Sequence, residues 1–283
     1  MKASIQNVAL LATLFLESAS ASCGHGTSMM KRHVHMKRDL NGGLQKRVEV
    51  ATFGYLGETG PTNWDKLAPE NAACRTSKVQ SPIDINPETS TLVEAGKLKM
   101  DFPHLEGAEF ENLGSTIEVI MEGKNATTTV DGKVFNLAQF HFHTPGEHAI
   151  NGEYMPLEMH MVHEAEDGAL AVIAVPFQLC EAGGSNPLLN ALLPSMEAIR
   201  EPGKVTETGP IDFSGLIAAL EVQPLRTYSG SLTTPPCAEG LTFFVATQTL
   251  PLDVKTYNLM KSIIGFNSRF VQNAVGADNL LAL

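Results

Sequence analysis

The chain has 283 residues, of which 43% are hydrophobic and 18% are charged, and its formal net charge is −11. This length and composition suit one domain with a large core, and they exclude a collagen-like, disordered or membrane-bundle protein. The acidic balance argues against nucleic acid as a partner, because phosphate backbones are bound by clustered Lys and Arg.

The N-terminus has the three-part layout of a secretory signal peptide. Lys2 precedes an apolar run over 8–16, and small residues follow up to Ala21. We expect residues 1–21 to be removed and the protein to be secreted into the extracellular space. The apolar run is far shorter than the ~20 residues that span a bilayer, so no membrane association is expected.

Residues 22–47 form a polar stretch with three pairs of basic residues, Lys31-Arg32, Lys37-Arg38 and Lys46-Arg47. Two interpretations are open for this stretch, namely a propeptide that is cleaved at such pairs or a solvated N-terminal tail. The folded domain is predicted over 48–283.

The middle of the chain predicts strands, and the later part predicts helices. Strand-like segments, separated by Gly, Asn and Asp turn signals, occupy 116–121, 127–130, 134–143, 156–164 and 170–177. Helical spacing occurs at 187–200, 212–220 and 254–264, the last after a candidate N-cap at Asp253. This order predicts a mainly β (α+β) fold with a large central twisted, mostly antiparallel sheet and peripheral helices.

The cysteines and one sequon fit an oxidising compartment. The chain holds Cys23, Cys74, Cys180 and Cys237. In a secreted protein these predict at least one disulfide and not a four-cysteine metal site. Asn125 begins a glycosylation sequon between two strand-like segments, where a turn would expose it, so it is a candidate glycosylation site.

Two of the strand-like segments carry histidines at strand spacing. His141 and His143 are two residues apart, so both imidazoles project from one face of a strand while Phe140 and Phe142 project from the other. The second segment alternates in the same way and is joined to the first by a connection of hairpin length. His160 is therefore predicted to lie across from the first two histidines and to complete a three-histidine site.

The neighbouring residues favour a metal site over an isolated pair of surface or core histidines. A histidine that binds a metal donates its other ring N–H to an acceptor, and Gln139 and Glu158 stand beside the histidines to accept. Three neutral imidazoles leave an open fourth position on zinc, which is typical of catalytic sites. The pattern thus predicts a catalytic Zn²⁺ held by His141, His143 and His160.

Two further motifs, Gln80-Ser-Pro-Ile-Asp84 and Tyr228-Ser-Gly-Ser-Leu-Thr-Thr-Pro-Pro-Cys237, accompany the histidine segments. In combination these segments resemble the alpha-class carbonic anhydrases of the secreted type. Weaker matches extend the resemblance to about residues 53–270, and they are Phe53-Gly-Tyr55, Gly146-Glu147-His148 and Asn267-Ser-Arg269.

The resemblance implies the alpha-carbonic anhydrase fold and a zinc-dependent, reversible hydration of carbon dioxide to bicarbonate and a proton by zinc-bound hydroxide. It also implies inhibition by sulfonamides and anions. The alternative is a catalytically weak carbonic anhydrase-like binding protein with secondary esterase activity, but such relatives usually lack a ligand histidine. A different three-histidine enzyme, such as a hydrolase or a cupin-like oxygenase, leaves the Thr-Thr-Pro-Pro segment unexplained.

The resemblance also implies roles for residues around the metal. Thr233 would accept the hydrogen bond of the zinc-bound hydroxide, be oriented by Glu147, and bind a bicarbonate oxygen through its backbone N–H. Thr234 would contact bicarbonate from the side. An apolar wall for carbon dioxide would be formed by Val162, Val172 and Leu232.

Two structural features follow from the same resemblance. Cys74 and Cys237 match the disulfide of secreted members, and Pro82 and Pro236 match cis prolines. Cys180 is then left with no partner but Cys23, which a propeptide cut would remove, so it is predicted either to stay free or to link two chains in a homodimer.

The resemblance fails at the proton shuttle. Fast members carry a histidine partway up the cavity, whereas this chain has Ser115 at that position, and serine does not titrate near neutral pH. We therefore expect proton transfer to limit turnover. Glu118, which makes the cavity more acidic, and His104 are the other candidate shuttles.

Overall fold

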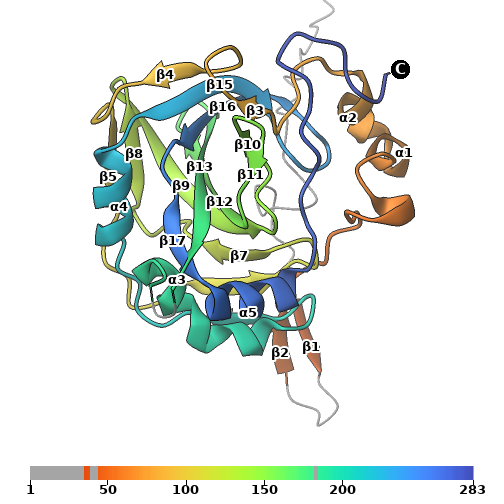
Figure 1. The fold of residues 1–283 in the computed structure, drawn as a ribbon. Coiled ribbons are helices and arrows are strands. Elements are labelled where there is room, and N and C mark those ends of the chain that lie inside the picture. Colours follow the sequence, from red (N-terminus) through yellow and green to blue (C-terminus); the bar gives the residue numbers. More distant parts are fainter. Residues whose placement is uncertain (1–34, 39–43, 182–183, 283) are drawn as a thin grey trace, which may run out of the picture.

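The computed structural model describes residues 35–38, 44–181 and 184–282, and a large twisted sheet lies at its centre (Figure 1). The main path of the sheet runs β14-β6-β7-β9-β12-β13-β16-β15-β4, while β8 joins β9, β5 joins β8, and β17 joins β13. These neighbours are antiparallel except that β13 runs parallel to β16 and β17. Within the described residues, its strands are β4 (Thr91–Val93), β5 (Leu98–Asp101), β6 (Glu109–Asn112), β7 (Ile117–Ile120), β8 (Thr127–Val130), β9 (Lys133–His143), β12 (Leu157–Ala165), β13 (Leu170–Cys180), β14 (Val205–Glu207), β15 (Leu225–Ser231), β16 (Glu239–Ala246) and β17 (Leu250–Asp253).

Smaller elements surround this sheet, so the predicted mainly β fold with peripheral helices is confirmed. Two small sheets are formed by β3 (Asp84–Ile85), β10 (Ala149–Ile150) and β11 (Glu153–Tyr154), and by β1 (His35–Arg38) and β2 (Leu44–Arg47). The α-helices are α1 (Trp64–Leu67), α2 (Ala73–Thr76), α3 (Pro187–Leu192), α4 (Ser214–Glu221) and α5 (Val254–Ile264). The 3₁₀ helices are η1 (Gly57–Thr59), η2 (Pro69–Ala72) and η3 (Leu193–Ile199).

The structure agrees with most of the predicted elements. The five predicted strands correspond to β7, β8, β9, β12 and β13. Helix α5 begins after Asp253, whose carboxylate accepts hydrogen bonds from the backbone N–H groups of Lys255 and Thr256, as an N-cap should.

One predicted helix is wrong in its type. The segment 187–200 is not a single α-helix but α3 followed by the 3₁₀ helix η3. Pro194 explains the change, because it has no backbone N–H to continue the α-helical hydrogen bonds. The peptide bonds before Pro82 and Pro236 are cis, as the resemblance implied, and a further cis bond precedes Pro145.

The two faces of the sheet have different partners. Phe140 and Phe142 are fully buried in the main core, to which α3, η3, α4 and α5 contribute their apolar side chains. The helices therefore cover the face opposite to the histidines. A smaller apolar cluster, which includes Val162, Phe243 and Ile83, lies on the histidine face.

Some predictions fall on residues that the structure does not describe. Residues 1–34 and 39–43 lie outside the described residues, and with them the predicted signal peptide, Cys23 and much of the 22–47 stretch. The division into these segments stays a prediction. In the described part of the chain, no helix is long and apolar enough to cross a membrane.

His163 is an unusual polar residue of the main core. It is 1% exposed, and its ring contacts Phe102. Its Nδ1 donates to the carbonyl of Met161 at 2.9 Å, and its Nε2 lies 2.9 Å from the hydroxyl of Thr128. Burial lowers the pKa of His163 to about 4, so the ring is neutral when folded.

This burial predicts a loss of stability at acidic pH. The unfolded chain takes up a proton on His163 near pH 6.5, whereas the folded chain resists protonation down to a pKa of about 4. The free energy of unfolding should therefore fall by about 3 kcal/mol between these pH values through this residue alone. Urea unfolding of the parent and of His163→Gln at pH 7 and pH 4.5 measures this, and equal losses in both proteins would contradict it.

Candidate metal centre

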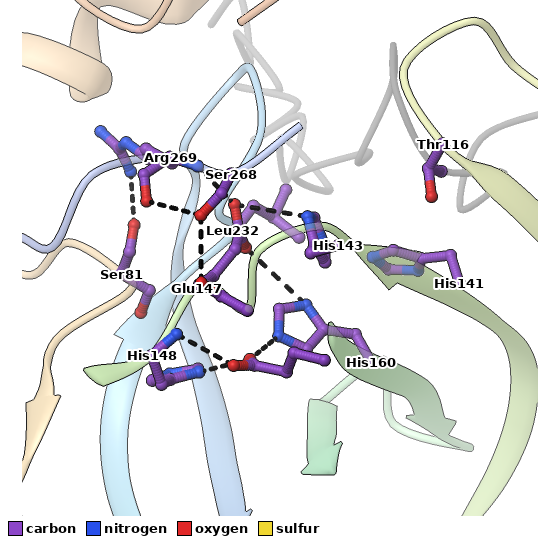
Figure 2. Close-up of polar contacts among 12 residues, drawn as sticks. Ser81, Thr116, His141, His143, Glu147, His148, His160, Leu232, Ser268 and Arg269 are labelled. Atoms are coloured by element: carbon purple, nitrogen blue, oxygen red, sulfur yellow. Dashed lines mark hydrogen bonds and ion pairs between the residues drawn. The ribbon is translucent and has the colours of Figure 1, made fainter. Parts of the chain in front are cut away.

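Strands β9 and β12 bring the three predicted ligands together (Figure 2). His141 and His160 face each other as Cα partners, and His143 lies two residues further along β9. One ring nitrogen from each histidine lies within 4.8 Å of the others, and all three side chains are buried. Regular strand alternation thus suffices to make the three imidazoles converge.

On β9, the Nδ1 atoms of the two histidines are held by acceptors of the protein. His141 Nδ1 lies 2.9 Å from Gln139 Oε1, and His143 Nδ1 donates to the carbonyl oxygen of Asn267 at 2.8 Å. Each ring therefore turns its Nε2 inward. The Nε2 of His143 is buried with no hydrogen-bond partner among the described residues. Because buried polar atoms normally have a partner, this nitrogen fits the role of a metal ligand.

His160 is oriented the other way around by a chain of hydrogen bonds. Its Nε2 lies 2.5 Å from Glu158 Oε1, which also lies 2.7 Å from His148 Nδ1. His148 Nε2 in turn lies 2.7 Å from the hydroxyl of Tyr228, which is 2.9 Å from Ser81 Oγ. The Nδ1 of His160 is thereby left for a metal. Because these hydrogen bonds occupy Glu158 and both ring nitrogens of His148, the two residues orient the ligand His160 and do not form a second metal site with it.

The electrostatic surroundings keep the β9 histidines neutral. Burial lowers the pKa of His141 well below its ordinary value, and the neighbouring His143 and His160 lower it further. Burial also lowers the pKa of His143. At His160, burial acts in the same direction but is outweighed by the hydrogen bond and charge of Glu158, which raise its pKa. Neutral imidazole is the form that binds metal, so His141 and His143 are ready to bind.

Glu147 is fully buried beside these rings. One oxygen accepts a hydrogen bond from the backbone N–H of Arg269 at 2.9 Å. The other oxygen has no hydrogen-bond partner among the described residues. A buried carboxylate oxygen needs a donor, and the Thr233 hydroxyl is the donor that the sequence predicts. The hydrogen bond between Thr233 and Glu147 stays a prediction.

The loop between β15 and β16 carries Thr233 and Thr234, both 5% exposed. The backbone N–H of Cys237 donates to the carbonyl of Thr234 at 2.8 Å, which closes a turn. The predicted disulfide between Cys74 and Cys237 is confirmed, with an S–S distance of 2.01 Å. The loop is therefore covalently tied to helix α2.

The segment that begins at Gln80 holds the same loop from another side. Ser81 and Ser231 exchange two hydrogen bonds, each from a backbone N–H to the other hydroxyl, at 2.9 and 3.1 Å. Gln80 Nε2 donates to the carbonyl of Cys237 at 3.1 Å. Arg269 donates from its guanidinium to Ser81 O at 2.7 Å and to Gln80 Oε1 at 2.8 Å. The segment that contains Cys74, Gln80 and Ser81 thus holds the loop, and Arg269 holds that segment in turn.

The predicted apolar wall is assembled next to the histidines. Val162, Val172 and Leu232 belong to one buried cluster together with Phe243. The ring of Phe243 lies edge-on to that of His160, with 5.7 Å between the centroids. The cluster that contains the predicted wall therefore contacts one predicted metal ligand through Phe243.

The shuttle candidates lie in different places. Ser115 is 3% exposed in the loop between β6 and β7, and its carbonyl oxygen accepts from Asn267 Nδ2 at 3.0 Å. Glu118 is fully buried and is the Cα partner of His141 on the adjacent strand. Cross-strand partners share a face, so Glu118 lies on the ligand side of the sheet.

His104 lies away from this site. Its neighbour Phe102 packs edge-on to Phe213, which packs in the same way on Phe140. Phe140 points to the face opposite to His141, so the loop of His104 borders the main core. This position argues against His104 as a shuttle.

Sequence reasoning missed the roles of His148, Tyr228, Asn267 and Arg269. His148 and Tyr228 extend the hydrogen bonds of Glu158, whereas Asn267 and Arg269 act on the site through backbone atoms. The sequence did offer one indication that His148 belongs to the site, namely its position next to Glu147. Tyr228, Asn267 and Arg269 lie in segments that carried the resemblance, but backbone atoms carry no residue signature, so the sequence did not indicate the contacts of the Asn267 carbonyl and the Arg269 N–H.

The remaining predicted sites lie at the surface. Asn125 is exposed at the turn before β8 and has a φ of 57°. Cys180 is half-buried and forms no disulfide within the described residues. Glycosylation and chain linkage at these positions stay predictions.

These features define a class of protein: a three-histidine metal centre on adjacent antiparallel strands of a large sheet, with an apolar wall beside it. The sequence profile of eukaryotic-type carbonic anhydrases matches residues 59–275. The chain belongs to the alpha carbonic anhydrase family.

Individual relatives agree with this assignment. A carbonic anhydrase of Pectobacterium carotovorum is 35% identical over 223 residues, which cover 78% of this chain and 86% of the relative. The fungal alpha carbonic anhydrase of Aspergillus oryzae has a TM-score of 0.77 and 42% identity, over 81% of this chain and 96% of that one. The alpha-carbonic anhydrase of Thermovibrio ammonificans, solved with the inhibitor sulfanilamide, has a TM-score of 0.70 and 35% identity, over 80% and 97%.

The acceptor beside His141 provides a test of the metal centre. Gln139→Leu removes the acceptor of the ring N–H and should weaken zinc binding about 10- to 100-fold. Gln139→Glu keeps an acceptor for the His141 ring N–H. The amide Nε2 of Gln139 is buried with no hydrogen-bond partner among the described residues, so its replacement by an oxygen loses no hydrogen bond. The Glu variant should therefore bind zinc nearly as well as the parent. Competition with a chromophoric chelator measures both, and parent-like affinity in the Leu variant would argue against this geometry.

Proposed function

We propose that this protein catalyses the reversible hydration of carbon dioxide to bicarbonate and a proton, with one zinc ion as its cofactor. The observation that supports this most is the convergence of one ring nitrogen from each of His141, His143 and His160. Three imidazoles and no carboxylate are the donor set of a catalytic zinc site. Bound zinc would acidify a water molecule and so supply a nucleophile at neutral pH, a property for which carbonic anhydrases are themselves the reference case.

The residues around the site would direct the attack. Arg269 fixes one oxygen of Glu147, which leaves the other oxygen to accept the hydroxyl proton of Thr233. Having donated its proton, the Thr233 oxygen can only accept a hydrogen bond from the attacking water. This constraint would turn a lone pair of the water toward the substrate carbon, and Thr234 would contact the product beside it.

The apolar wall suits the substrate. Carbon dioxide carries neither a net charge nor a hydrogen-bond donor, so it is held by contact with apolar surface and not by specific polar groups. Val162, Val172 and Leu232 supply such surface in the cluster whose Phe243 contacts His160. Bicarbonate is charged and would be released more readily from this wall than from a polar pocket.

The alternative, a catalytically weak binding protein with secondary esterase activity, has no observation in its favour. It would be expected to lack part of the ligand set, whereas His141, His143 and His160 converge here. Because the Thermovibrio relative was solved with sulfanilamide, we also propose that sulfonamides and inorganic anions inhibit this protein.

We further propose that the protein is secreted. The Cys74–Cys237 disulfide supports this, because such bonds persist mainly in oxidising compartments. The exposed position of Asn125 also suits a sequon that is glycosylated on the secretory route.

Stopped-flow measurement of carbon dioxide hydration tests the activity. The zinc-loaded protein should be active, whereas chelation of zinc or His160→Ala should abolish activity. Thr233→Val removes the hydroxyl at nearly constant volume and should lower kcat/KM about 100-fold, while Thr233→Ser should retain most of it. Activity that survives both chelation and His160→Ala would refute the zinc mechanism, and inactivity of the zinc-loaded parent would favour the binding protein.

Proton transfer should limit the maximal rate. Because Ser115 stands where a titrating shuttle is expected, added imidazole should raise kcat in weak buffer several-fold and leave kcat/KM unchanged. Ser115→His should raise kcat in weak buffer and respond less to imidazole. An identical response of parent and variant to imidazole would show that another group carries the proton.

A further inference from the structure

The folded body of the protein begins at Val48. This residue is 5% exposed, and its backbone N–H donates to the carbonyl of Gly203 at 3.1 Å. Three residues later, Ala51 N–H donates to the carbonyl of Leu113 at 2.9 Å. Among the described residues, buried hydrophobic side chains start at Val48 and continue to Met260. The core and the metal centre therefore need nothing that precedes Val48 among those residues.

The described chain before Val48 forms a hairpin, whose last residue, Arg47, bridges Lys204 of the body in antiparallel pairing. Strands β1 and β2 pair with each other in a two-stranded sheet, and Figure 1 shows this hairpin projecting from the body. Strand β2 ends with the basic pair Lys46-Arg47. The pair thus stands at the junction between the projecting hairpin and the folded domain.

Surface contacts hold this pair to the body. The ammonium group of Lys46 pairs with the carboxylate of Glu109, and the Lys46 side chain is 44% exposed. Arg47 Nη2 donates to the carbonyl of Pro202 at 3.1 Å. These few contacts lie at the surface, contribute little to stability and open readily. A protease that binds extended peptide can therefore draw β2 away from the body. To reach the bond before Val48 it must also open the hydrogen bond from Val48 N–H to Gly203 and expose the Val48 side chain at the start of the core.

Charge divides the chain at the same point. Residues 1–47 hold seven of the 20 Lys and Arg residues but only two of the 31 Asp and Glu residues. The segment is therefore basic, whereas the domain that follows is more acidic than the whole chain. A cut at this junction separates two parts of opposite net charge.

We propose that Lys46-Arg47 is a processing site, at which an endoprotease specific for paired basic residues cuts the bond between Arg47 and Val48. Water adds across this peptide bond, so that Arg47 ends in a carboxylate and Val48 begins with an ammonium group. The inference goes beyond the proposed activity and does not depend on it, and it rests only on the proposed secretion, by which the chain would meet such a protease. It selects the propeptide interpretation for residues 22–47.

The position of the pair distinguishes it from the neighbouring pair Lys37-Arg38. That pair lies at the end of β1, so a cut after Arg38 would sever the hairpin and leave β2 on the domain without its partner strand. An unpaired edge strand is a liability for aggregation. A cut after Arg47 removes both strands together and leaves no such edge.

Digestion of the full chain, purified with its N-terminal segment intact and loaded with zinc, tests the site. A protease specific for paired basic residues should produce Val48 as the new N-terminus of the stable product, as read by intact mass and N-terminal sequencing. Arg47→Gln should block this cut, whereas the matched variant Arg38→Gln should leave it unchanged. A stable product that begins after Arg38, or no cleavage of the native chain, would overturn the proposal.

Secretion of the full chain from a eukaryotic host gives a second readout that needs no activity. The secreted parent should begin at Val48 and elute later from an anion exchanger than Arg47→Gln, because it has lost the basic segment. Its thermal midpoint should differ from that of the uncut variant by less than about 3 °C, since the core is untouched. Retention of residues 22–47 by the secreted parent would exclude processing at this site.

Discussion

The buried guanidinium of Arg269 is the constraint on which the rest of the site depends. Its side chain is fully buried, and burial lowers its pKa to about 10, while the charge of Glu147 opposes that effect. A buried cation is tolerated only when it is paired and hydrogen-bonded. Arg269 donates from Nη1 to Ser81 and from Nη2 to Gln80, while its Nε has no partner among the described residues. Its backbone N–H fixes the carboxylate of Glu147. One residue thus links the N-terminal motif to the group predicted to orient Thr233.

The position of the loop that carries Thr233 depends on the hydrogen bonds of Arg269. Gln80 and Ser81 are hydrogen-bonded both to Arg269 and to the loop, so they connect the buried cation to the loop. The disulfide at Cys237 adds a covalent constraint from helix α2. Because these anchors lie far from the loop in the sequence, the loop is fixed by tertiary contacts as well as by its own turn. Such support from outside is what a catalytic group needs to hold its geometry.

Predictions from the sequence succeeded where the alternation of side chains along a strand decides which face a residue lies on. Strand alternation alone placed His141 and His143 on one face and Phe140 on the other, and it put Glu158 beside His160. Sequence-based prediction failed where a contact is made by a distant residue or by a backbone atom. The acceptor for His143 is a carbonyl oxygen 124 residues away, which no side-chain pattern could indicate. The 187–200 segment was misjudged because its apolar spacing suggested one helix, whereas the missing N–H of Pro194 ends α3.

The sheet register also separates the two shuttle candidates that the sequence left equal. Glu118 shares the ligand face with His141, whereas His104 borders the core on the other side. The candidate imidazole is thus remote from the metal centre, and the near candidate is a carboxylate. A shuttle must pass its proton on to buffer, and the fully buried Glu118 has no exposed surface from which to do so. The predicted dependence on external buffer therefore rests on the placement of both residues, and not on Ser115 alone.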